Sequence, residues 1–534
     1  MARATRLPKG TNDFSNSATD PAPVTIVVPI YGDLTTLMAC VESLKHNVNL
    51  ARNRILLVND CGPDADLIES SLLAKIEGWT SIRYERNQRN LGFLGTCNRA
   101  VTELDTTEND ILLLNSDTVT TPGFLEEMSA VLYLSPLHGI ACARSNNATI
   151  ASFPFTLRDP SAGYEIPRTA EVHAALSCTV RRYSISPVAH GFCFLVRRAL
   201  IETHGLFDEA FAPGYYEEYD FCLRMNEIGY VSILANRALV FHVGNRSFDG
   251  VDEADALCGA NQKLFYARYP FFERALEGYF LDRDAVDVFA DALLPADEVR
   301  RVLFDVDVIP KVGLPENTCA LLAALQRARD PKHLVVSVAV PDDHRNCIAG
   351  QHPELEVIPH SHLSQIWDVA IAFSDTVSCS QLIRLNRVSP RWVFTSTNID
   401  RVSTWRRRAG NISERALAQD ALRYADAIIA LSKGVSIELL SCAGRGIIGL
   451  PATSIVELDG MDADSIVRHI VDRYGRSPID VEQLRARWDY FACLACYGLE
   501  LSRRDGRTEN AAARLFTSVK RLMRKHGSLP QVWS

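Results

Sequence analysis

Two aspartates near the start of the chain stand where a carboxylate could do chemistry. Asp60 follows the apolar run at residues 55–58, and Asp117 follows the one at residues 111–114. Either side chain alone could simply cap the helix that comes next. Two carboxylates in one crevice would repel a nucleoside diphosphate, but a hard divalent cation, Mg²⁺ or Mn²⁺, can bridge carboxylate and phosphate oxygens. The pair therefore indicates a metal-bridged phosphate site.

A second set of acids, Glu217, Glu218 and Asp220, crowds the start of a predicted helix after Gly214. The helix dipole would stabilise any one of them there without a catalytic role. Three acids interleaved with tyrosines exceed what capping requires. His242 lies in an apolar run, where spacing alone favours a buried histidine over a metal ligand.

Strands alternating with helices must position the first two aspartates. Short β-rich or apolar runs at residues 24–29, 55–58, 81–85 and 111–114 are separated by helical patterns and short loops. This alternation predicts a parallel, doubly wound α/β sheet, and right-handed crossovers bring the carboxyl ends of its strands to one edge. Neither G-x-G-x-x-G nor G-x-x-x-x-G-K-[ST] occurs, so the dinucleotide and P-loop interpretations lose their main support.

The remainder of the chain indicates further domains. A Pro-punctuated loop is expected from residue 144 to about residue 186. A second alternation predicts a Rossmann-like α/β domain, with strands within 302–308, 333–340, 369–373, 392–395 and 427–431. We expect a disordered tail at 1–22, a first domain at 23–270, a helical linker at 271–299, the second α/β domain at 300–480 and C-terminal helices at 481–534.

The predicted C-terminal helix has an apolar face. Leu484, Trp488 and Phe491 fall on one side of it. This face could pack on the second domain or support a homo-oligomer.

Composition narrows the class of protein. The 534 residues carry a net charge of −9 with a pI near 5.9, which argues against a general nucleic-acid binder. No window approaches the roughly 20 apolar residues of a membrane span, and the 14 cysteines, mostly inside apolar runs, are typical of reduced thiols. A cytoplasmic protein is the expectation. The basic runs at 406–408 and 520–525 are usually solvated surface, with peripheral contact to anionic lipid at the inner face of the membrane as the minority interpretation.

Seven motifs together carry a resemblance to a known family. They are Val-Val-Pro-Ile-Tyr (27–31), Val-Asn-Asp (58–60), Arg-Asn-Leu-Gly-Phe (89–93), Leu-Asn-Ser-Asp-Thr (114–118), Ser-Asn-Asn-Ala-Thr (145–149), Gly-Tyr-Tyr-Glu-Glu-Tyr-Asp-Phe-Cys-Leu-Arg (214–224) and Phe-His-Val-Gly (241–244). On these motifs, residues 24–248 resemble inverting glycosyltransferases of family 2, which have the GT-A fold, close to the bacterial rhamnosyltransferase-like group. Residues 424–433 resemble the end of the N-terminal half of a family 4 transferase with the GT-B fold.

The resemblance implies a donor site. Tyr31 and Asp60 would hold the nucleotide base. The whole set of expected donor-binding residues is Pro29, Tyr31, Asp60, Asn90, Gly92, Asn115, Ser116 and Asp117. Asp117 and His242 would bind the metal ion, Mn²⁺ or Mg²⁺. Asn115 stands where the family has its first acid, so the site should hold metal less tightly than a doubly acidic one.

The resemblance also implies a catalytic base and an acceptor side. Glu218 aligns with the general base, although Glu217 beside it could serve instead. The expected acceptor-side residues are Gly191, Tyr215, Tyr216 and Asp220.

The implied function is metal-dependent, inverting transfer of a sugar from a nucleoside-diphosphate sugar to a hydroxyl of a cell-surface glycan or lipid-linked glycan intermediate, in bacterial polysaccharide and cell-envelope biosynthesis. Nucleotidyl transfer shares the acidic crevice but normally needs a Gly-rich, Lys-containing loop, which residues 30–33 do not provide. A catalytically inactive carbohydrate- or partner-binding protein is the alternative, favoured by Asn115. Only about a hundred residues follow Lys433, too few for a complete donor-binding domain. The second domain is therefore expected to bind acceptor or serve as a scaffold.

Overall fold

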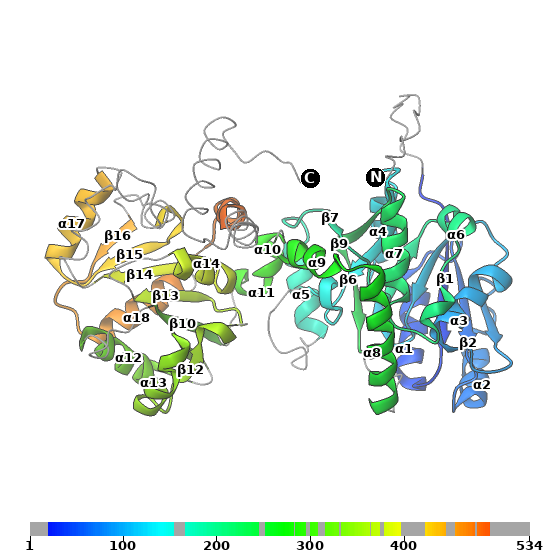
Figure 1. Cartoon of the computed structure of the whole chain (residues 1–534), viewed down its shortest axis with the longest axis horizontal. Coiled ribbons are helices and arrows are strands. Elements are labelled where there is room, and N and C mark those ends of the chain that lie inside the picture. The colour runs from blue at the N-terminus through cyan, green and yellow to red at the C-terminus, as the bar shows by residue number, and fades with distance from the viewer. Residues whose placement is uncertain are drawn as a thin grey trace, which may run out of the picture. The chain divides into compact units, whose positions relative to one another are not determined.

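The computed structural model describes residues 20–153, 166–244, 251–281, 283–294, 299–307, 316–330, 333–363, 365–373, 379–396, 422–444, 454–475 and 478–491. The chain divides into two compact units. The first comprises residues 1–151 and 182–270, and the second comprises residues 152–181 and 271–534. Each unit contains one β-sheet with helices packed against it (Figure 1).

The first unit is built on a nine-stranded mixed sheet. Its strands are β1 (Val24–Ile30), β2 (Arg54–Asn59), β3 (Ile82–Arg86), β4 (Asp110–Leu114), β5 (Thr118–Thr120), β6 (His138–Arg144), β7 (Tyr183–Ser186), β8 (Cys193–Val196) and β9 (Val231–His242). They run in the order β3-β2-β1-β4-β8-β6-β9-β5, with β7 paired to β9. The first four strands are parallel, whereas β8 is antiparallel to β4 and β6. The predicted α/β fold is confirmed.

Helices and short turns connect these strands. They are α1 (Leu34–Asn47), α2 (Ala65–Ile76), α3 (Gly92–Arg99), η1 (Ala100–Leu104), α4 (Phe124–Leu132), η2 (Thr149–Ala151), α6 (Arg198–His204), η3 (Glu209–Phe211), α7 (Glu217–Glu227) and α8 (Val251–Arg268). Every residue of β4 is buried, as expected for a central strand covered on both faces. α1 begins after Asp33, whose Oδ1 accepts a hydrogen bond from the Thr36 amide at 3.2 Å, so the side chain caps the helix.

The second unit contains a seven-stranded parallel sheet. Its strands are β10 (Arg300–Val306), β11 (Leu334–Val340), β12 (Glu356–Pro359), β13 (Val369–Phe373), β14 (Trp392–Ser396), β15 (Ala427–Ala430) and β16 (Ile455–Glu457). The order β12-β11-β10-β13-β14-β15-β16 reverses direction between β10 and β13. This is the strand order of a Rossmann-like sheet, which confirms the predicted fold of the second domain.

Helices cover both faces of the second sheet. They are α12 (Glu316–Ala328), η4 (Asp342–His344), α13 (Arg345–Gln351), η5 (His360–His362), α14 (Cys379–Val388), η7 (Leu422–Tyr424), α17 (Lys433–Gly444) and α18 (Ala463–Tyr474). In β10, Val302 and Phe304 belong to the apolar cluster that includes α12 and α18, whereas Leu303 belongs to the cluster of α14 and α17. Alternate strand residues point to opposite faces, so the two helix groups lie on opposite sides of the sheet (Figure 1).

The segment expected to be a loop from residue 144 to 186 contains a helix, α5 (Ile166–Leu176), and the strand β7. Val172 and Leu176 of α5 pack with Val286 of α10 (Ala285–Val288) and Ala290 of α11 (Ala290–Leu293). Residues 152–181 therefore belong to the second unit and interrupt the domain expected at 23–270. The segment expected as a linker, which also contains α9 (Phe272–Leu281), is helical and belongs to the second unit.

The apolar face of the C-terminal helix packs on the second unit. Residues 481–491 are helical. Leu484 and Trp488 join a buried cluster with Phe289. The rings of Phe491 and Trp392 lie 5.6 Å apart. Residues 492–534 of the predicted C-terminal helices lie outside the described residues, as do most of the predicted tail and the basic runs at 406–408 and 520–525.

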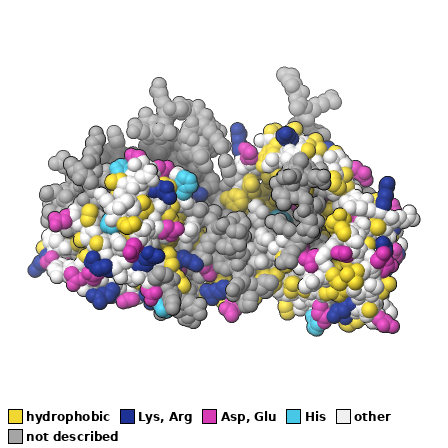
Figure 2. Space-filling model, turned by 90° about the horizontal axis from the view of Figure 1, so that it is seen from below, with side chains coloured by type: hydrophobic (Ala, Val, Ile, Leu, Met, Phe, Trp, Pro, Cys, Tyr) yellow, Lys and Arg dark blue, Asp and Glu magenta, His cyan; other side chains and the backbone are white. Residues whose placement is uncertain are grey.

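Surface charge, the state of the cysteines and the apolar character of the helices are as follows for the described residues. Acidic and basic side chains are interspersed on the face drawn in Figure 2. The eleven cysteines for which a state is described are free thiols, and six of them are buried. None of the described helices combines the length and the apolar character needed to cross a membrane.

Asp220 of α7 is the centre of a buried ion-pair network. Its Oδ2 accepts a hydrogen bond from Arg224 Nε at 2.8 Å, and its Oδ1 accepts from Arg268 Nη1 and from the Tyr269 hydroxyl, each at 2.9 Å. Asp220 is 0% exposed. Both oxygens are bonded within the chain, and these bonds join α7 to the end of α8. The expected contact of Asp220 with an acceptor stays a prediction.

We expect Asp220→Asn to lower the free energy of unfolding by about 3 kcal/mol or more, because it leaves two guanidinium groups without their buried partner. The matched control is Asp208→Asn. Asp208 also bonds Arg268 at 2.8 Å, but its side chain is 37% exposed, and the loss should stay within about 1 kcal/mol. Urea unfolding of the full-length chain measures both. Equal losses would contradict the structural role of Asp220.

Candidate active site

Asp117 occupies the turn between β4 and β5, and contacts with His242 and Gly244 hold its side chain. β5 pairs antiparallel with the end of β9, which sets Thr118 opposite His242. This register brings His242 Nε2 to 3.4 Å from Asp117 Oδ1. The Gly244 amide donates to Asp117 Oδ2 at 2.9 Å. The Asp117 side chain is therefore fixed, with Oδ1 directed at the imidazole.

The imidazole of His242 is oriented by two asparagines. Its Nδ1 lies 2.8 Å from the Asn147 carbonyl oxygen, and its backbone amide donates to Asn146 Oδ1 at 2.9 Å. A carbonyl oxygen can only accept, so Nδ1 carries the proton and a neutral ring leaves its lone pair on Nε2. Both asparagines belong to the Ser-Asn-Asn-Ala-Thr motif at residues 145–149, and the motif alone indicates no role for them.

The two partners shift each other's pKa. Burial lowers the pKa of His242, but the hydrogen bond and charge of Asp117 outweigh burial, and the net pKa is raised. Burial raises the pKa of Asp117, but the hydrogen bond and charge of His242 outweigh it, and the net pKa is lowered. The pair favours an ionised carboxylate at neutral pH.

The donor atoms near Asp117 fit a divalent metal ion whose coordination a ligand completes. Asn115 Nδ2 lies 3.5 Å from His242 Nε2, so an amide, an imidazole and a carboxylate converge. Within the described residues no group of three or more His, Cys, Asp or Glu side chains could hold a metal ion. A site with one carboxylate and one imidazole resembles Mg²⁺ or Mn²⁺ sites that rely on substrate phosphates for further ligands.

Asp60 lies at the end of β2 and is fixed by the loop after β3. Its Oδ1 accepts hydrogen bonds from Asn87 Nδ2 at 2.7 Å and from the Leu91 amide at 2.8 Å. Asn87 is itself buried and also donates to Thr96 Oγ1 at 2.8 Å. Asn87 was not among the predicted site residues. The sequence indicates it only by its position in the polar run that follows β3.

Tyr31 and Gly62 meet beside Asp60. A Cβ atom on Gly62 would lie 1.8 Å from the Tyr31 carbonyl oxygen, so no other residue fits this position without a shift of the backbone. The Tyr31 side chain is exposed and available for contact with a ligand. Pro29 lies deeper, opposite Val58 in the β1–β2 ladder.

The loop with Asn90 and Gly92 packs against the segment that leads into α7. Asn90 Oδ1 accepts from the Gly92 amide at 2.8 Å, and Gly92 has a φ of +75°. A Cβ atom on Gly92 would lie 2.5 Å from Pro213 Cβ. The Leu94 amide donates to the Pro213 carbonyl oxygen at 3.2 Å. The donor-side loop thus touches the chain just before the acids of α7.

The turn before α7 has an unusual backbone. Tyr215 and Tyr216 have φ values of +77° and +72°, a region that non-glycine residues seldom adopt. Asn261 of α8 donates to the carbonyl oxygens of Phe211 at 2.9 Å and Gly214 at 2.7 Å, and so holds this turn. Asn261 lies 46 residues or more after this turn, and no local pattern in the sequence indicates its contact with the turn. Strain held by neighbouring contacts is frequent at functional sites.

The two glutamates at the start of α7 differ in their surroundings. Glu217 is 4% exposed, and its Oε2 has no hydrogen-bond partner within the described part of the chain. Burial, and then the charge of Glu218, raise the pKa of Glu217 well above its usual range. Glu218 is half-buried, and its Oε1 accepts from the Gly191 amide at 3.3 Å. Burial raises the pKa of Glu218 to about 7.

The segment from His190 to Phe192 connects the two groups of predicted site residues. Gly191 contacts Glu218, and the Phe192 carbonyl oxygen accepts from the Asn115 amide at 2.9 Å. The Phe192 ring is stacked on the His242 ring at a centroid distance of 5.3 Å. Burial and the charge of His242 lower the pKa of His190 to about 4, so this imidazole is neutral. Glu218 and the Asp117–His242 pair therefore border one short segment.

α3 carries the buried thiol of Cys97. Burial and then the charges of Glu217 and Asp60 raise the pKa of this thiol well above its usual range. Ser116, half-buried in the β4–β5 turn, completes the predicted set.

Comparisons with solved structures and curated proteins give distant matches at most. No curated protein matches the sequence. The chain is similar to the crystal structure of GalNAc-T7 with UDP, GalNAc and Mn²⁺ at 14% identity and a TM-score of 0.35, over 43% of this chain and 45% of that chain. It therefore spans less than half of that protein. It is also similar to the mannosyltransferase PcManGT from Pyrobaculum calidifontis in complex with GDP-Man and Mn²⁺, at 15% identity and a TM-score of 0.37, over 53% of this chain and 77% of that chain.

A family model gives the more direct assignment. The model described as glycosyl transferase family 2 matches residues 25–205, which span β1 to α6. The matched residues include Tyr31, Asp60 and Asp117 at the ends of β1, β2 and β4, as well as Gly191. Residues 25–205 are therefore similar to glycosyltransferase family 2, and the match includes residues 152–181, which belong to the second unit.

Proposed function

We propose that the first unit is a metal-dependent, inverting glycosyltransferase that moves a sugar from a nucleoside-diphosphate sugar to a hydroxyl group of a glycan or lipid-linked glycan intermediate. The observation that carries the proposal is the segment at Gly191 and Phe192, which contacts Glu218 on one side and the Asp117–His242 group on the other. The carboxylate of Glu218, which can accept a proton, would then lie on one side of the reacting centre. The cation site for the diphosphate would lie on the other side.

Glu218 is the general base in this proposal. The attacking hydroxyl must lose a proton, and a carboxylate with a pKa near 7 combines basicity with a substantial ionised fraction at neutral pH. Glu217 is buried more deeply, and burial and then the charge of Glu218 raise its pKa well above its usual range. The less buried Glu218 is therefore the residue that we propose as the base.

The donor would lie across the ends of β1, β2 and β4. Asp60 uses Oδ1 for its two bonds within the chain, which leaves Oδ2 to accept an N–H of the nucleotide base. The exposed ring of Tyr31 offers a surface on which the base can stack. Asn90 and Gly92 would border the same nucleotide.

Asp117 Oδ1 and His242 Nε2 would hold Mn²⁺ or Mg²⁺, with Asn115 as a neutral neighbour. A divalent ion bound there supplies positive charge to the departing diphosphate. The base would lie on one side of the anomeric carbon and the leaving diphosphate on the other. This arrangement suits direct displacement, which inverts the configuration at that carbon.

The acceptor would enter beside the strained turn at Tyr215 and Tyr216, next to Gly191. A cell-surface glycan or lipid-linked intermediate, in bacterial cell-envelope biosynthesis of the rhamnosyltransferase-like type, is proposed on the motif resemblance alone. The second unit would then serve as an acceptor-binding or scaffolding module.

We expect the wild-type protein with Mn²⁺ to hydrolyse one member of a panel of nucleotide sugars slowly, and Glu218→Gln to reduce this turnover by roughly 10² or more, the usual scale for a general base. Donor affinity should remain nearly unchanged in the variant. Glu217→Gln is the matched control and should keep most of the activity. Donor binding without any turnover would favour an inactive binding protein, and release of pyrophosphate from a nucleoside triphosphate would favour nucleotidyl transfer.

Asp117→Asn should weaken Mn²⁺-dependent binding of UDP, GDP or dTDP by more than about tenfold, because even outer partners of a metal site typically matter by 10- to 100-fold. Isothermal titration calorimetry with and without MnCl₂ measures the effect. Asp66→Asn, at an exposed position on α2, serves as the control and should bind like the wild type. Metal-independent binding of equal strength in both variants would argue against the assigned ligand.

The pH dependence should report the raised pKa of Glu218. The base acts only when ionised, so kcat/KM should fall as the pH drops below about 7 and level off above it. Glu217→Gln should retain this acidic limb, because Glu217 does not accept the proton in this proposal. If kcat/KM fell only near pH 4, or if Glu217→Gln removed the acidic limb of the profile, Glu218 would not be the base.

A further inference from the structure

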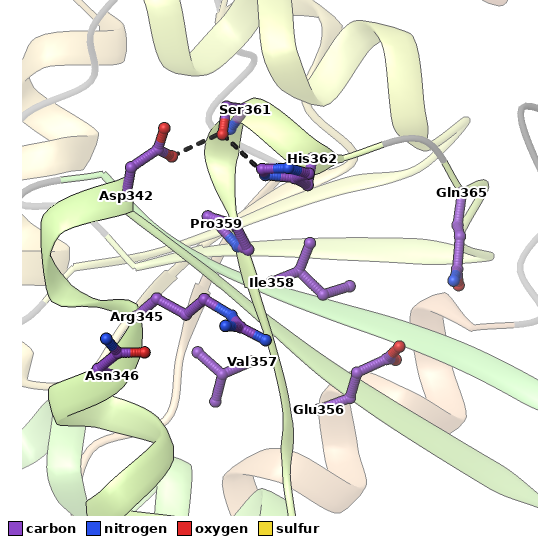
Figure 3. A pocket seen from close by; sticks show the side chains of 10 residues that line it. All are labelled: Asp342, Arg345, Asn346, Glu356, Val357, Ile358, Pro359, Ser361, His362 and Gln365. Atoms are coloured by element: carbon purple, nitrogen blue, oxygen red, sulfur yellow. Dashed lines mark hydrogen bonds between the residues drawn. The ribbon is translucent and has the colours of Figure 1, made fainter.

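The second unit has a hollow of about 640 Å³ that lies along β12 and the turns after β11 and β12 (Figure 3). Its polar lining residues are Asp342, Arg345, Asn346, Glu356, Ser361, His362 and Gln365. In parallel α/β sheets ligands bind outside the carboxyl ends of the strands. The volume also falls in the usual range of roughly 300–1,000 Å³ for small-ligand sites.

The wall of the hollow formed by η5 is fixed by hydrogen bonds and by an ion pair with a buried residue of the second unit. Asp342 Oδ1 accepts from the Ser361 amide at 3.1 Å, and Ser361 Oγ lies 3.0 Å from His362 Nδ1 (Figure 3). The preceding residue, His360, turns inward, with Nε2 3.4 Å from Oδ1 of the fully buried Asp305. η5 therefore presents Ser361 and His362 from a fixed position.

Several groups around the hollow remain available for a ligand. Arg345, which extends from the start of α13 toward β12 in Figure 3, makes no hydrogen bond or ion pair with the described part of the chain. Asn346 is likewise without a partner there. Glu356 Oε2 accepts from Ser337 Oγ at 2.6 Å, which orients the carboxylate and leaves Oε1.

The balance of charge decides the class of ligand. Two carboxylates, Asp342 and Glu356, face one guanidinium, so a phosphate or nucleoside diphosphate would meet net repulsion. A hydroxyl group both donates and accepts, so it can bind a carboxylate, a guanidinium or an amide. Val357, Ile358 and Pro359 add apolar surface for C–H groups. We propose that this hollow binds a neutral saccharide.

Addition of a peptide strand to β12 is less compatible with the same observations. β12 is an edge strand of four residues that ends in Pro359 and begins with Glu356. A short edge strand with a charge and a proline is a common means of preventing pairing with another chain. The saccharide site goes beyond the transferase reaction and does not depend on it, since binding can be measured without turnover.

The test uses the full-length protein on an array of neutral and anionic oligosaccharides, followed by titration calorimetry with the strongest neutral ligand. We expect a neutral oligosaccharide to bind, and Arg345→Ala to weaken it by at least about tenfold, the effect of losing hydrogen bonds to a charged group. Glu356→Gln should also weaken binding. Arg468→Ala removes an exposed arginine at the opposite end of the sheet and should bind like the wild type.

The inference is overturned if no neutral oligosaccharide binds, or if Arg345→Ala and Glu356→Gln leave binding unchanged. It is also overturned if UDP binds and this binding depends on Arg345. Asp117→Asn separates this inference from the proposed transferase. If that variant abolishes saccharide binding, the ligand lies in the first unit, and the second-unit site fails while the transferase proposal stands. If only the transferase proposal fails, saccharide binding and its dependence on Arg345 persist.

Discussion

The antiparallel pairing of β5 with the end of β9 is the constraint on which the rest of the candidate active site depends. It sets Thr118 opposite His242 and thereby brings the imidazole beside Asp117. A shift of one residue would turn every side chain of β9 to the other face of the sheet. The same pairing aligns the Val243 and Gly244 amides on Asp117, at 3.0 and 2.9 Å. The chain thus fixes one carboxylate by backbone geometry rather than by side-chain packing alone.

The buried acids of this protein divide into two kinds by their partners. Asp220 and Asp305 are fully buried, and each is bound by arginine. Burial raises the pKa of Asp305, but His360 and Arg384 outweigh it, and the net pKa is lowered. Among the described residues Glu217 and Glu218 form no ion pair, and burial raises the pKa of both. The arginine partners of Asp220 and Asp305 thus favour the ionised carboxylate, whereas burial without such a partner favours the protonated one.

The two sheets begin alike and then diverge, and this difference decides which segments lie at the carboxyl ends of their strands. Each starts with three parallel strands followed by a crossover to a fourth, β3-β2-β1-β4 in the first unit and β12-β11-β10-β13 in the second. In the first unit the next strand, β8, is antiparallel, so the segment before it, with Gly191 and Phe192, arrives at the carboxyl end of β4. The second sheet stays parallel throughout. Its hollow at β11 and β12 therefore draws on the segments that directly follow these strands, together with β12 itself.

Local pattern in the sequence determined the buried strands, the aspartates that follow them, the acids that begin α7 and the apolar face of the C-terminal helix. These features are readable because strand and helix periodicity involves residues within a few positions of each other. Tertiary structure alone decided that α5 belongs to the second unit, that Arg268 and Tyr269 enclose Asp220, and that Asn87 holds Asp60. Each depends on partners distant in sequence, which are brought together by the fold and which no local period records.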